Sequence, residues 1–193
     1  MAYKNLKLKP SRNIAPHDIR ANFRAEFTGE AGDLVKVKTF DPDNETYYSQ
    51  GEGVGASYDG VYSNKFQSPW TVEKAVEGDR ASVVLGITLE GTAVTDNHGN
   101  KIDGFNQRFA DENGFVASGK PIQIATRGNF WVSSSIIEGT PAPGSGLAIG
   151  PTAGGLKTVD PNVAVNSTGD FIVGKVLSTA GTRQGDVNIE LTL

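Results

Sequence analysis

Residues 19–27 read Ile-Arg-Ala-Asn-Phe-Arg-Ala-Glu-Phe, with an apolar side chain at every odd position and a polar one at every even position. A strand places successive side chains on opposite faces, so this period of two predicts one buried and one solvated strand face. The last residues, 186–193, alternate in the same way, which indicates that the chain end is tied into a sheet. Further segments of strand length follow at 34–40, 82–89, 121–126, 129–132 and 171–177.

Composition agrees with a chain that turns often between short strands. The 193 residues include 24 glycines and 9 prolines. Helix evidence is confined to residues 68–78, which carry Ser68, Pro69 and Gly78 as start and stop signals but are also short enough to be a strand. We therefore expect a mainly β fold, a single sandwich or barrel-like domain with little helix.

Charge is distributed unevenly along the chain. Residues 1–25 carry six basic side chains against Asp18 alone, a net charge of +5, whereas the whole chain carries −4, so the remainder carries −9. Pro10 and Pro16 favour an extended path. We expect residues 1–18 to form an extended basic arm on a β domain of residues 19–193. Its partner would be nucleic acid, an acidic protein surface or a neighbouring copy, with a solvated chain end as the alternative. The candidate contact residues are Lys4, Lys7, Lys9 and Arg12.

Residues 41–69 interrupt the strand rhythm and contain four of the five tyrosines. A structureless segment of this length is uncommon in a domain and is usually functional or disordered. Tyrosine- and glycine-rich segments make adaptable contact surfaces. We interpret this segment as an insertion, with a segment that orders only in an assembly as the alternative. Its candidate contact residues are Tyr47, Tyr48, Tyr58 and Tyr62.

Motifs for cofactors and catalysis are absent or incomplete. Residues 150–158, Gly-Pro-Thr-Ala-Gly-Gly-Leu-Lys-Thr, resemble a phosphate loop, but Leu156 separates the lysine from the glycine that should precede it. A glycine-rich β-turn is the alternative. Acidic turns at 41–45 and 96–103 lack the EF-hand spacing and leave only a surface calcium open. We predict no metal site and no cofactor.

Catalytic residues are equally hard to assemble from the sequence. The chain has no cysteine, and its two histidines leave little for a histidine-based triad. Carboxylates are plentiful, but no motif places a pair in a cleft. Apolar stretches are far shorter than the ~20 residues of a membrane-spanning helix. We therefore expect neither catalytic residues nor a membrane segment, with a carboxylate enzyme as a remote alternative.

The strand segments follow one another in a characteristic order. They are Ala-Gly-Asp-Leu-Val at 31–35, Leu-Gly-Ile at 85–87, Pro-Ile-Gln-Ile-Ala-Thr-Arg-Gly at 121–128, Phe-Trp-Val at 130–132, Val-Gly-Lys-Val-Leu at 173–177 and Gly-Asp-Val-Asn-Ile-Glu-Leu at 185–191. This set resembles the capsid decoration, or cement, proteins of tailed bacteriophages. The resemblance covers about residues 31–40 and 81–193, and leaves the insertion and the arm outside it.

The resemblance implies a non-enzymatic structural protein of the virion. Such proteins are similar in sitting as homotrimers on the outer capsid surface, where they bridge major capsid subunits. We therefore expect the major capsid protein and further copies of this chain as partners, with neither nucleic acid nor membrane among them. The absence of cysteine, and of an apolar core after the basic N-terminus, leads us to expect synthesis in the host cytoplasm. The alternative is a virion fibre or tail-associated module whose Tyr/Gly-rich segment binds the host.

Overall fold

Strands dominate the part of the chain that the computed structural model describes, which is residues 7–25, 27–38, 71–80, 83–93, 115–117, 121–160, 171–179 and 185–193. The helical segments described there are the 3-10 turns η2 (Pro16–Asp18) and η4 (Ser134–Ile136). The strands are β1 (Leu8–Asn13), β2 (Ile19–Ala25), β3 (Leu34–Val37), β4 (Thr71–Lys74), β5 (Val84–Thr88), β6 (Gly91–Ala93), β7 (Phe115–Ala117), β8 (Pro121–Ala125), β9 (Arg127–Ser133), β10 (Ile137–Glu138), β11 (Gly146–Ile149), β12 (Leu156–Val159), β13 (Gly174–Thr179) and β14 (Asp186–Thr192). The prediction of a mainly β fold is confirmed.

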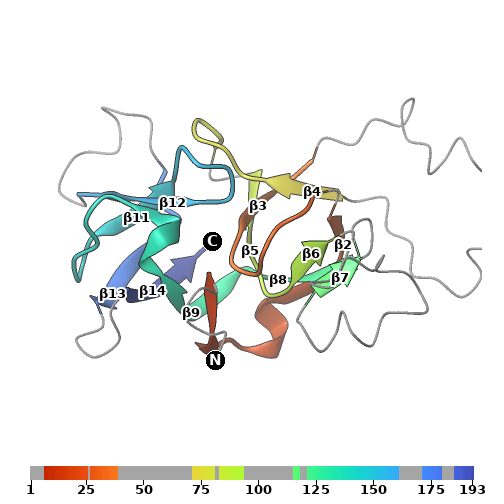
Figure 1. Cartoon of the computed structure of the whole chain (residues 1–193), viewed down its shortest axis with the longest axis horizontal. Helices are drawn as coiled ribbons and strands as arrows, with labels where there is room; N and C mark the ends of the chain where they lie inside the picture. Colours follow the sequence, from red (N-terminus) through yellow and green to blue (C-terminus); the bar gives the residue numbers. More distant parts are fainter. Residues whose placement is uncertain are drawn as a thin grey trace, which may run out of the picture.

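Seven of these strands form one sheet in the order β1-β9-β14-β13-β11-β12-β10. The C-terminal strand β14 pairs antiparallel with β9 along its whole length, from Asp186 opposite Ser133 to Thr192 opposite Arg127. On its other side β14 pairs with β13. The chain end is therefore held inside the sheet, as the alternation of residues 186–193 predicts (Figure 1).

Five other strands close into a barrel in the order β2-β4-β3-β5-β8. A short parallel contact between β2 and β4, with Ala25 opposite Val72, completes the ring of otherwise antiparallel pairs. The barrel lies beside the seven-stranded sheet (Figure 1). The small parallel pair β6-β7 lies at the side of the barrel away from that sheet. The barrel alternative of the predicted architecture is therefore the correct one for this half of the molecule.

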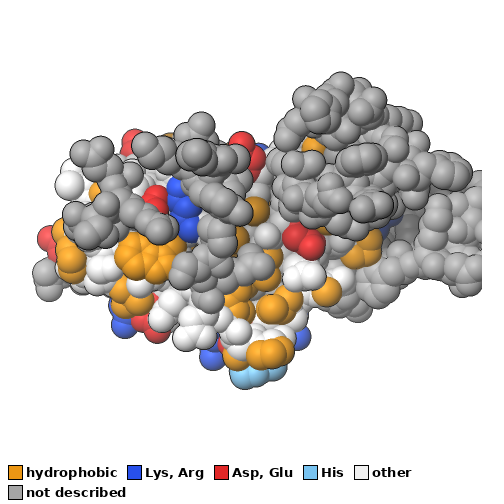
Figure 2. Space-filling view, turned by 60° about the horizontal axis from the view of Figure 1, so that its bottom comes forward, with side chains coloured by type: hydrophobic (Ala, Val, Ile, Leu, Met, Phe, Trp, Pro, Cys, Tyr) orange, Lys and Arg blue, Asp and Glu red, His pale blue; other side chains and the backbone are white. Residues whose placement is uncertain are grey.

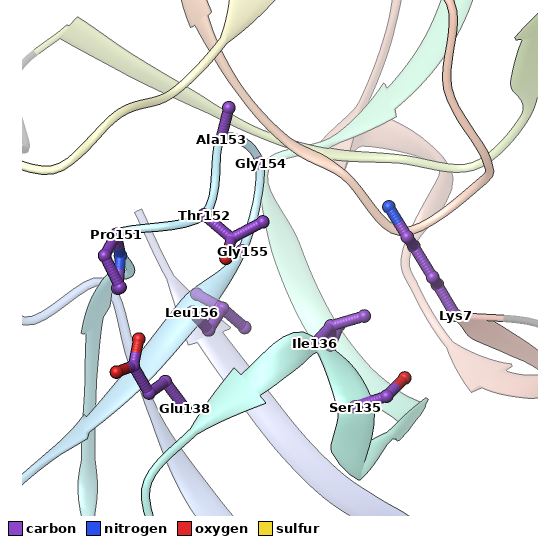
Figure 3. Close-up of a pocket in the computed structure, with 10 residues that line it drawn as sticks. All are labelled: Lys7, Ser135, Ile136, Glu138, Pro151, Thr152, Ala153, Gly154, Gly155 and Leu156. Carbon is purple, nitrogen blue, oxygen red and sulfur yellow. The ribbon is translucent and has the colours of Figure 1, made fainter.

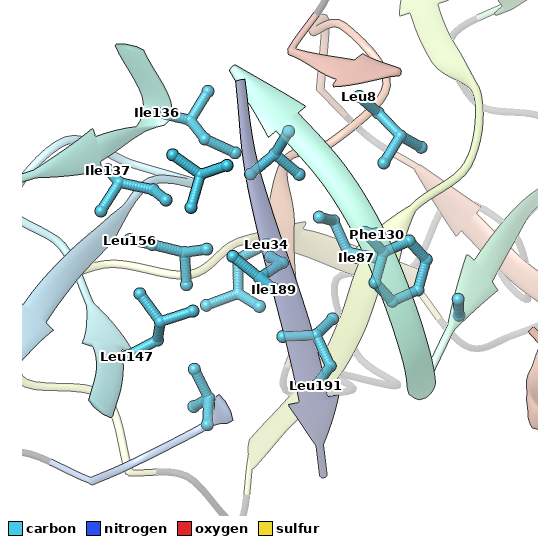
Figure 4. Packing of buried hydrophobic residues seen from close by; sticks show 14 of the residues in the cluster. Leu8, Leu34, Ile87, Phe130, Ile136, Ile137, Leu147, Leu156, Ile189 and Leu191 are labelled. Carbon is cyan, nitrogen blue, oxygen red and sulfur yellow. The ribbon is translucent and has the colours of Figure 1, made fainter. Parts of the chain in front are cut away.

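A large apolar cluster, which we call the junction core, fills the space between sheet and barrel (Figure 4). Leu34 and Ile87 from the barrel meet Phe130, Ile189 and Leu191 from the sheet, and each is at most 1% exposed. Burial of a side chain of this size stabilises a fold by about 1.5–3 kcal/mol. The two halves are thus held together by apolar packing.

A smaller cluster, the barrel core, fills the interior of the barrel. It contains Ala25, Val35, Val72, Ile122 and Ile124, and all are buried. Strand β3 serves both cores, because its neighbouring residues Leu34 and Val35 point to opposite faces. This explains why short runs of consecutive apolar residues recur in the sequence of the barrel strands.

Strand β2 departs from the single buried face that residues 19–27 predict. Ile19 packs against the junction core, whereas Phe23 and Ala25 belong with the barrel core. Ala21, between them, is exposed. The register with β8 shifts between Arg20 and Phe23, so the strand passes from one core to the other across an irregularity.

The helix alternative for residues 68–78 is wrong in the part that is described. Residues 71–74 form β4, with Val72 inside the barrel core, and the next residue, Ala75, lies in the junction core. Gly78 then adopts a positive φ of 92° in a turn. Contacts with β3, rather than helical hydrogen bonds, decide the structure of this short segment.

The N-terminal segment is part of the sheet from residue 8 onward. Residues 8–13 form β1, which pairs antiparallel with β9, with Leu8 opposite Val132 and Asn13 opposite Asn129. Leu8 is 5% exposed and belongs to the junction core. The arm that the sequence predicts for residues 1–18 is extended at 8–13, but there it fills the free edge of β9 in its own chain.

The predicted insertion 41–69 lies outside the described residues, but the two points where the chain leaves and re-enters the barrel are clear. Val37 at the end of β3 faces Val72 in β4, and the Lys38 N–H donates to the Thr71 carbonyl at 2.9 Å. Residues 39–70 therefore connect the two strands of a hairpin whose stem is closed by a hydrogen bond.

Candidate functional site

Asp33 is the centre of the most buried charge cluster in the described part of the chain. It precedes β3, and its side chain is 1% exposed. Oδ1 lies 2.6 Å from the Lys7 Nζ, and Oδ2 lies 2.9 Å from the Lys74 Nζ. The Lys74 contact is ionic, since its geometry gives Oδ2 no hydrogen bond. Two ammonium groups from separate segments thus converge on one carboxylate.

The backbone around Asp33 is fixed by Thr88 at the end of β5. The Thr88 hydroxyl accepts from the N–H groups of Gly32 and Asp33, both at 3.2 Å, and the Thr88 N–H donates to the Asp33 carbonyl at 3.0 Å. Gly32 has a φ of +106°, a conformation that side chains with a Cβ rarely adopt. The carboxylate is therefore presented from a rigid turn.

The glycine-rich segment 150–155 docks onto this turn from the sheet side. It connects β11 to β12 as a hairpin, with Ile149 opposite Leu156. The Leu34 N–H donates to the Gly154 carbonyl, and the Gly154 N–H donates to the Ala75 carbonyl, both at 2.8 Å. A Cβ at Gly154 would lie 3.1 Å from the Asp33 side chain. Of the two alternatives for this segment, a phosphate loop and a glycine-rich β-turn, the structure shows the turn. Its backbone groups form hydrogen bonds with the barrel.

A hollow of about 530 Å³ lies beside this hairpin (Figure 3). Its polar side chains are those of Lys7, Ser135, Glu138 and Thr152, which project from the N-terminal segment, η4, β10 and the hairpin. Lys7 is already paired with Asp33. The Ser135 hydroxyl lies 2.9 Å from the Ser133 hydroxyl, and no histidine belongs to the lining. The side-chain partner of the Ser135 hydroxyl is thus another hydroxyl and not a base.

A second ion pair anchors β1 on the sheet. The Lys9 Nζ lies 3.2 Å from the Asp186 Oδ1, and the two side chains are 9% and 15% exposed. β9 lies between β1 and β14, so this contact reaches across one strand. On the face shown in Figure 2, acidic and basic side chains of the described residues are interspersed with hydrophobic ones. The positive charge of the N-terminal segment is therefore partly neutralised within the chain.

The predicted contact residues are not gathered into one surface by the described structure. Lys7 and Lys9 do meet carboxylates, but these belong to the same chain. The backbone of Arg12 pairs with Phe130 in β9. Lys4 and all four candidate tyrosines, Tyr47, Tyr48, Tyr58 and Tyr62, lie outside the described residues.

A third charge cluster lies on the outer side of the barrel. The Lys36 Nζ lies 2.8 Å from the Asp79 Oδ1 and 3.3 Å from the Glu73 Oε1. The hydrogen bond to Asp79 raises the pKa of Lys36. Burial opposes ionisation of Asp79, but hydrogen bonds from Lys36 and the Val76 N–H outweigh it and lower its pKa. Both groups are charged at neutral pH, as expected of an ion pair that stabilises the fold.

Neither a metal-binding cluster nor a membrane-spanning helix occurs among the described residues. There, no three acidic or histidine side chains lie close enough together to hold a metal ion. Among the same residues, no helical segment has the length and hydropathy of a membrane span.

Comparisons with known proteins gave no match: no protein-family profile fits the sequence, and no curated protein or solved structure is significantly similar to it. The site residues that sequence reasoning missed are Asp33, Lys74 and Thr88. For Asp33, the sequence did offer one signal, an acidic residue directly before an apolar strand, within Ala-Gly-Asp-Leu-Val.

Proposed function

We propose that this protein is a non-enzymatic capsid decoration protein, which binds the outer surface of a tailed-phage head and stabilises the mature shell by bridging major capsid subunits. The proposal rests on the positions, in the structure, of the sequence motifs that carry the resemblance to decoration proteins. Each falls on a strand that builds the junction core or the barrel core, or on the turn that contains Asp33.

Three of the five glycines in these motifs lie where an added Cβ would collide with a backbone carbonyl. A Cβ at Gly86 would collide with the Ala125 carbonyl, and one at Gly174 would collide with the Glu190 carbonyl. A Cβ at Gly128 would lie 2.7 Å from the Asn13 carbonyl. The residues that carry the resemblance are thus required by this architecture, which supports a shared fold and, through it, the proposed function.

The physical task of a decoration protein suits such a molecule. A protein that binds only the expanded lattice stabilises that lattice by mass action. Many copies, each with modest contacts, give strong retention. Two halves packed on one core transmit load between capsid subunits without a flexible joint. We further propose that the copies form a closed trimer, since a three-fold ring matches a three-fold position on the lattice.

Location in the particle tests the proposal directly. The protein would be labelled with gold-tagged antibody on virions of the phage that encodes it, and heads assembled with and without it would be compared for DNA release on heating. We expect label over the head surface and earlier DNA release from heads that lack the protein. Label at the tail tip would replace this proposal with the host-binding alternative, and unlabelled virions would reject both.

A further inference from the structure

Strand β1 occupies an edge of the seven-stranded sheet at the N-terminal end of the described chain. Its strand partner there is β9 alone, and the register between them shifts between Leu8 and Arg12. Such a ladder is less continuous than the pairing of β14 with β9, which keeps one register over seven residues. β1 is therefore an edge strand that is held by an irregular ladder.

The contacts that hold β1 divide cleanly into two complementary sets. The strand side contributes Lys7, Leu8 and Lys9. The body contributes the carboxylates of Asp33 and Asp186, a place in the junction core, and the Ser133 N–H, which donates to the Lys7 carbonyl at 2.8 Å. In the two ion pairs that link this segment to the body, both lysines lie on the strand side and both carboxylates on the body.

The connection between β1 and the body is short and contains one turn. Ala15 is extended, with φ −76° and ψ 142°, and η2 follows from Pro16 to Asp18. On the body side, the Asp18 carbonyl accepts from the Thr126 N–H at 2.9 Å and from the Thr126 hydroxyl at 3.1 Å. The pivot is therefore confined to residues 14–17, where His17 is 82% exposed at its side chain.

We propose that β1 is exchanged between copies of this chain, so that residues 7–13 of one copy pair with β9 of the next. Lys7 and Lys9 then bind Asp33 and Asp186 of the neighbouring copy, and Leu8 enters its junction core. The exchanged contacts equal those within one chain, so assembly requires only that the turn at 16–18 opens. Head-to-tail exchange gives a ring when the rotation between successive copies closes. Only the ring size of three rests on the proposed function.

The absence of cysteine allows a direct test by disulfide cross-linking. Asn13 and Asn129 face each other across the β1-β9 pair, and such cross-strand positions have the Cα separation that a disulfide needs. Purified Asn13→Cys and Asn129→Cys chains of different tag mass would be mixed at high concentration, incubated and oxidised. We expect the mixed disulfide between the two chains to be the main product on a non-reducing gel.

A matched pair controls for random collision. Lys175 and Glu190 also face each other, but on β13 and β14, which lie inside the sheet. A mixture of Lys175→Cys and Glu190→Cys chains should give at least tenfold less mixed disulfide. Equal yields from the two mixtures would overturn the proposal.

Sedimentation gives a second and independent readout. The double variant Asn13→Cys/Asn129→Cys, oxidised at low concentration, locks β1 to its own body. We expect the wild type to associate on concentration and the locked chain to remain a monomer until a reductant is added. A locked chain that associates like the wild type, or a wild type that stays monomeric at every concentration, would overturn strand exchange. Neither result bears on the location of the protein in the virion.

Discussion

The barrel and the seven-stranded sheet deal differently with the edges of their strands. In the barrel, the parallel contact between β2 and β4 closes the ring, so each of its five strands has two neighbours. The sheet stays open and ends in β1 on one side and in the two-residue β10 on the other. Unpaired strand edges are where chains pair with further strands. The open half is therefore where we expect assembly to take place.

The two halves also differ in how much core each possesses. Among the described residues, the barrel core has five buried members, whereas the junction core has 19 and draws them from both halves. A small interior stabilises a domain poorly, since apolar burial supplies most of the driving force. The barrel thus depends on the sheet, and we expect one cooperative unfolding transition for both.

Phe130→Ala should have the largest effect, because it removes the largest fully buried side chain of the junction core. We expect a loss of about 3–5 kcal/mol in the free energy of unfolding. Urea unfolding followed by far-UV circular dichroism measures it. The matched variant is Ile124→Ala in the barrel core, for which the range is about 2–5 kcal/mol. Two separate transitions in either variant would contradict the shared core.

Asp33→Asn should cause the second-largest loss in the free energy of unfolding. It leaves the two ammonium groups of Lys7 and Lys74 without their carboxylate, and removal of one partner from a buried pair typically costs about 3–5 kcal/mol. Both lysine side chains keep access to water, at 32% and 24% exposed, so we expect about 2–3 kcal/mol. Thermal unfolding measures it. Glu190→Gln, which breaks the exposed pair with Lys175, serves as the control and should change stability by less than about 1 kcal/mol.

Gly174→Ala should destabilise the sheet by about 1–3 kcal/mol, because the added Cβ collides with the Glu190 carbonyl of β14. Gly146 on the adjacent β11 is the matched control. A Cβ there would meet its nearest atoms at 3.4 Å, which is ordinary contact, so Gly146→Ala should be nearly neutral. Urea midpoints of the two variants compare them. Equal losses would show that strand propensity, and not the close approach, sets the effect.

Asp79→Asn should have the smallest effect, at about 0–1 kcal/mol. The lowered pKa of Asp79 means that its contribution is present above its unfolded pKa of ~3.9 and is lost as the pH falls through the folded value. Because the pKa of Lys36 is raised in the folded state, the stabilisation that its charge contributes is lost only when the pH rises through that folded pKa. Stability curves of wild type and variant should therefore separate at neutral pH and converge in acid. A constant difference at all pH values would exclude the ion pair as the cause.

Alternation predicted the strands well where one strand faces one core. Residues 186–193 are such a case, since Val187, Ile189 and Leu191 are all buried in the junction core. It failed for β2, which passes between two cores, because a period of two carries no information on a register shift. The Asp33 cluster could not be predicted, since its members are brought together only by the tertiary fold. For the same reason, the charge of residues 1–18 predicted a negatively charged partner but could not show that Lys7 and Lys9 pair with Asp33 and Asp186 of this chain.

The hydrogen bond from the Lys38 N–H to the Thr71 carbonyl closes the hairpin stem at the point where the chain leaves for the 32 residues 39–70. The entropy of closing a loop grows only with the logarithm of its length, so doubling the segment would cost about 0.6 kcal/mol. By loop-closure entropy alone, the hairpin stem would tolerate large changes of length between β3 and β4. A lineage could replace this segment wholesale, or an engineer could graft a foreign peptide there, while the two cores stay as they are.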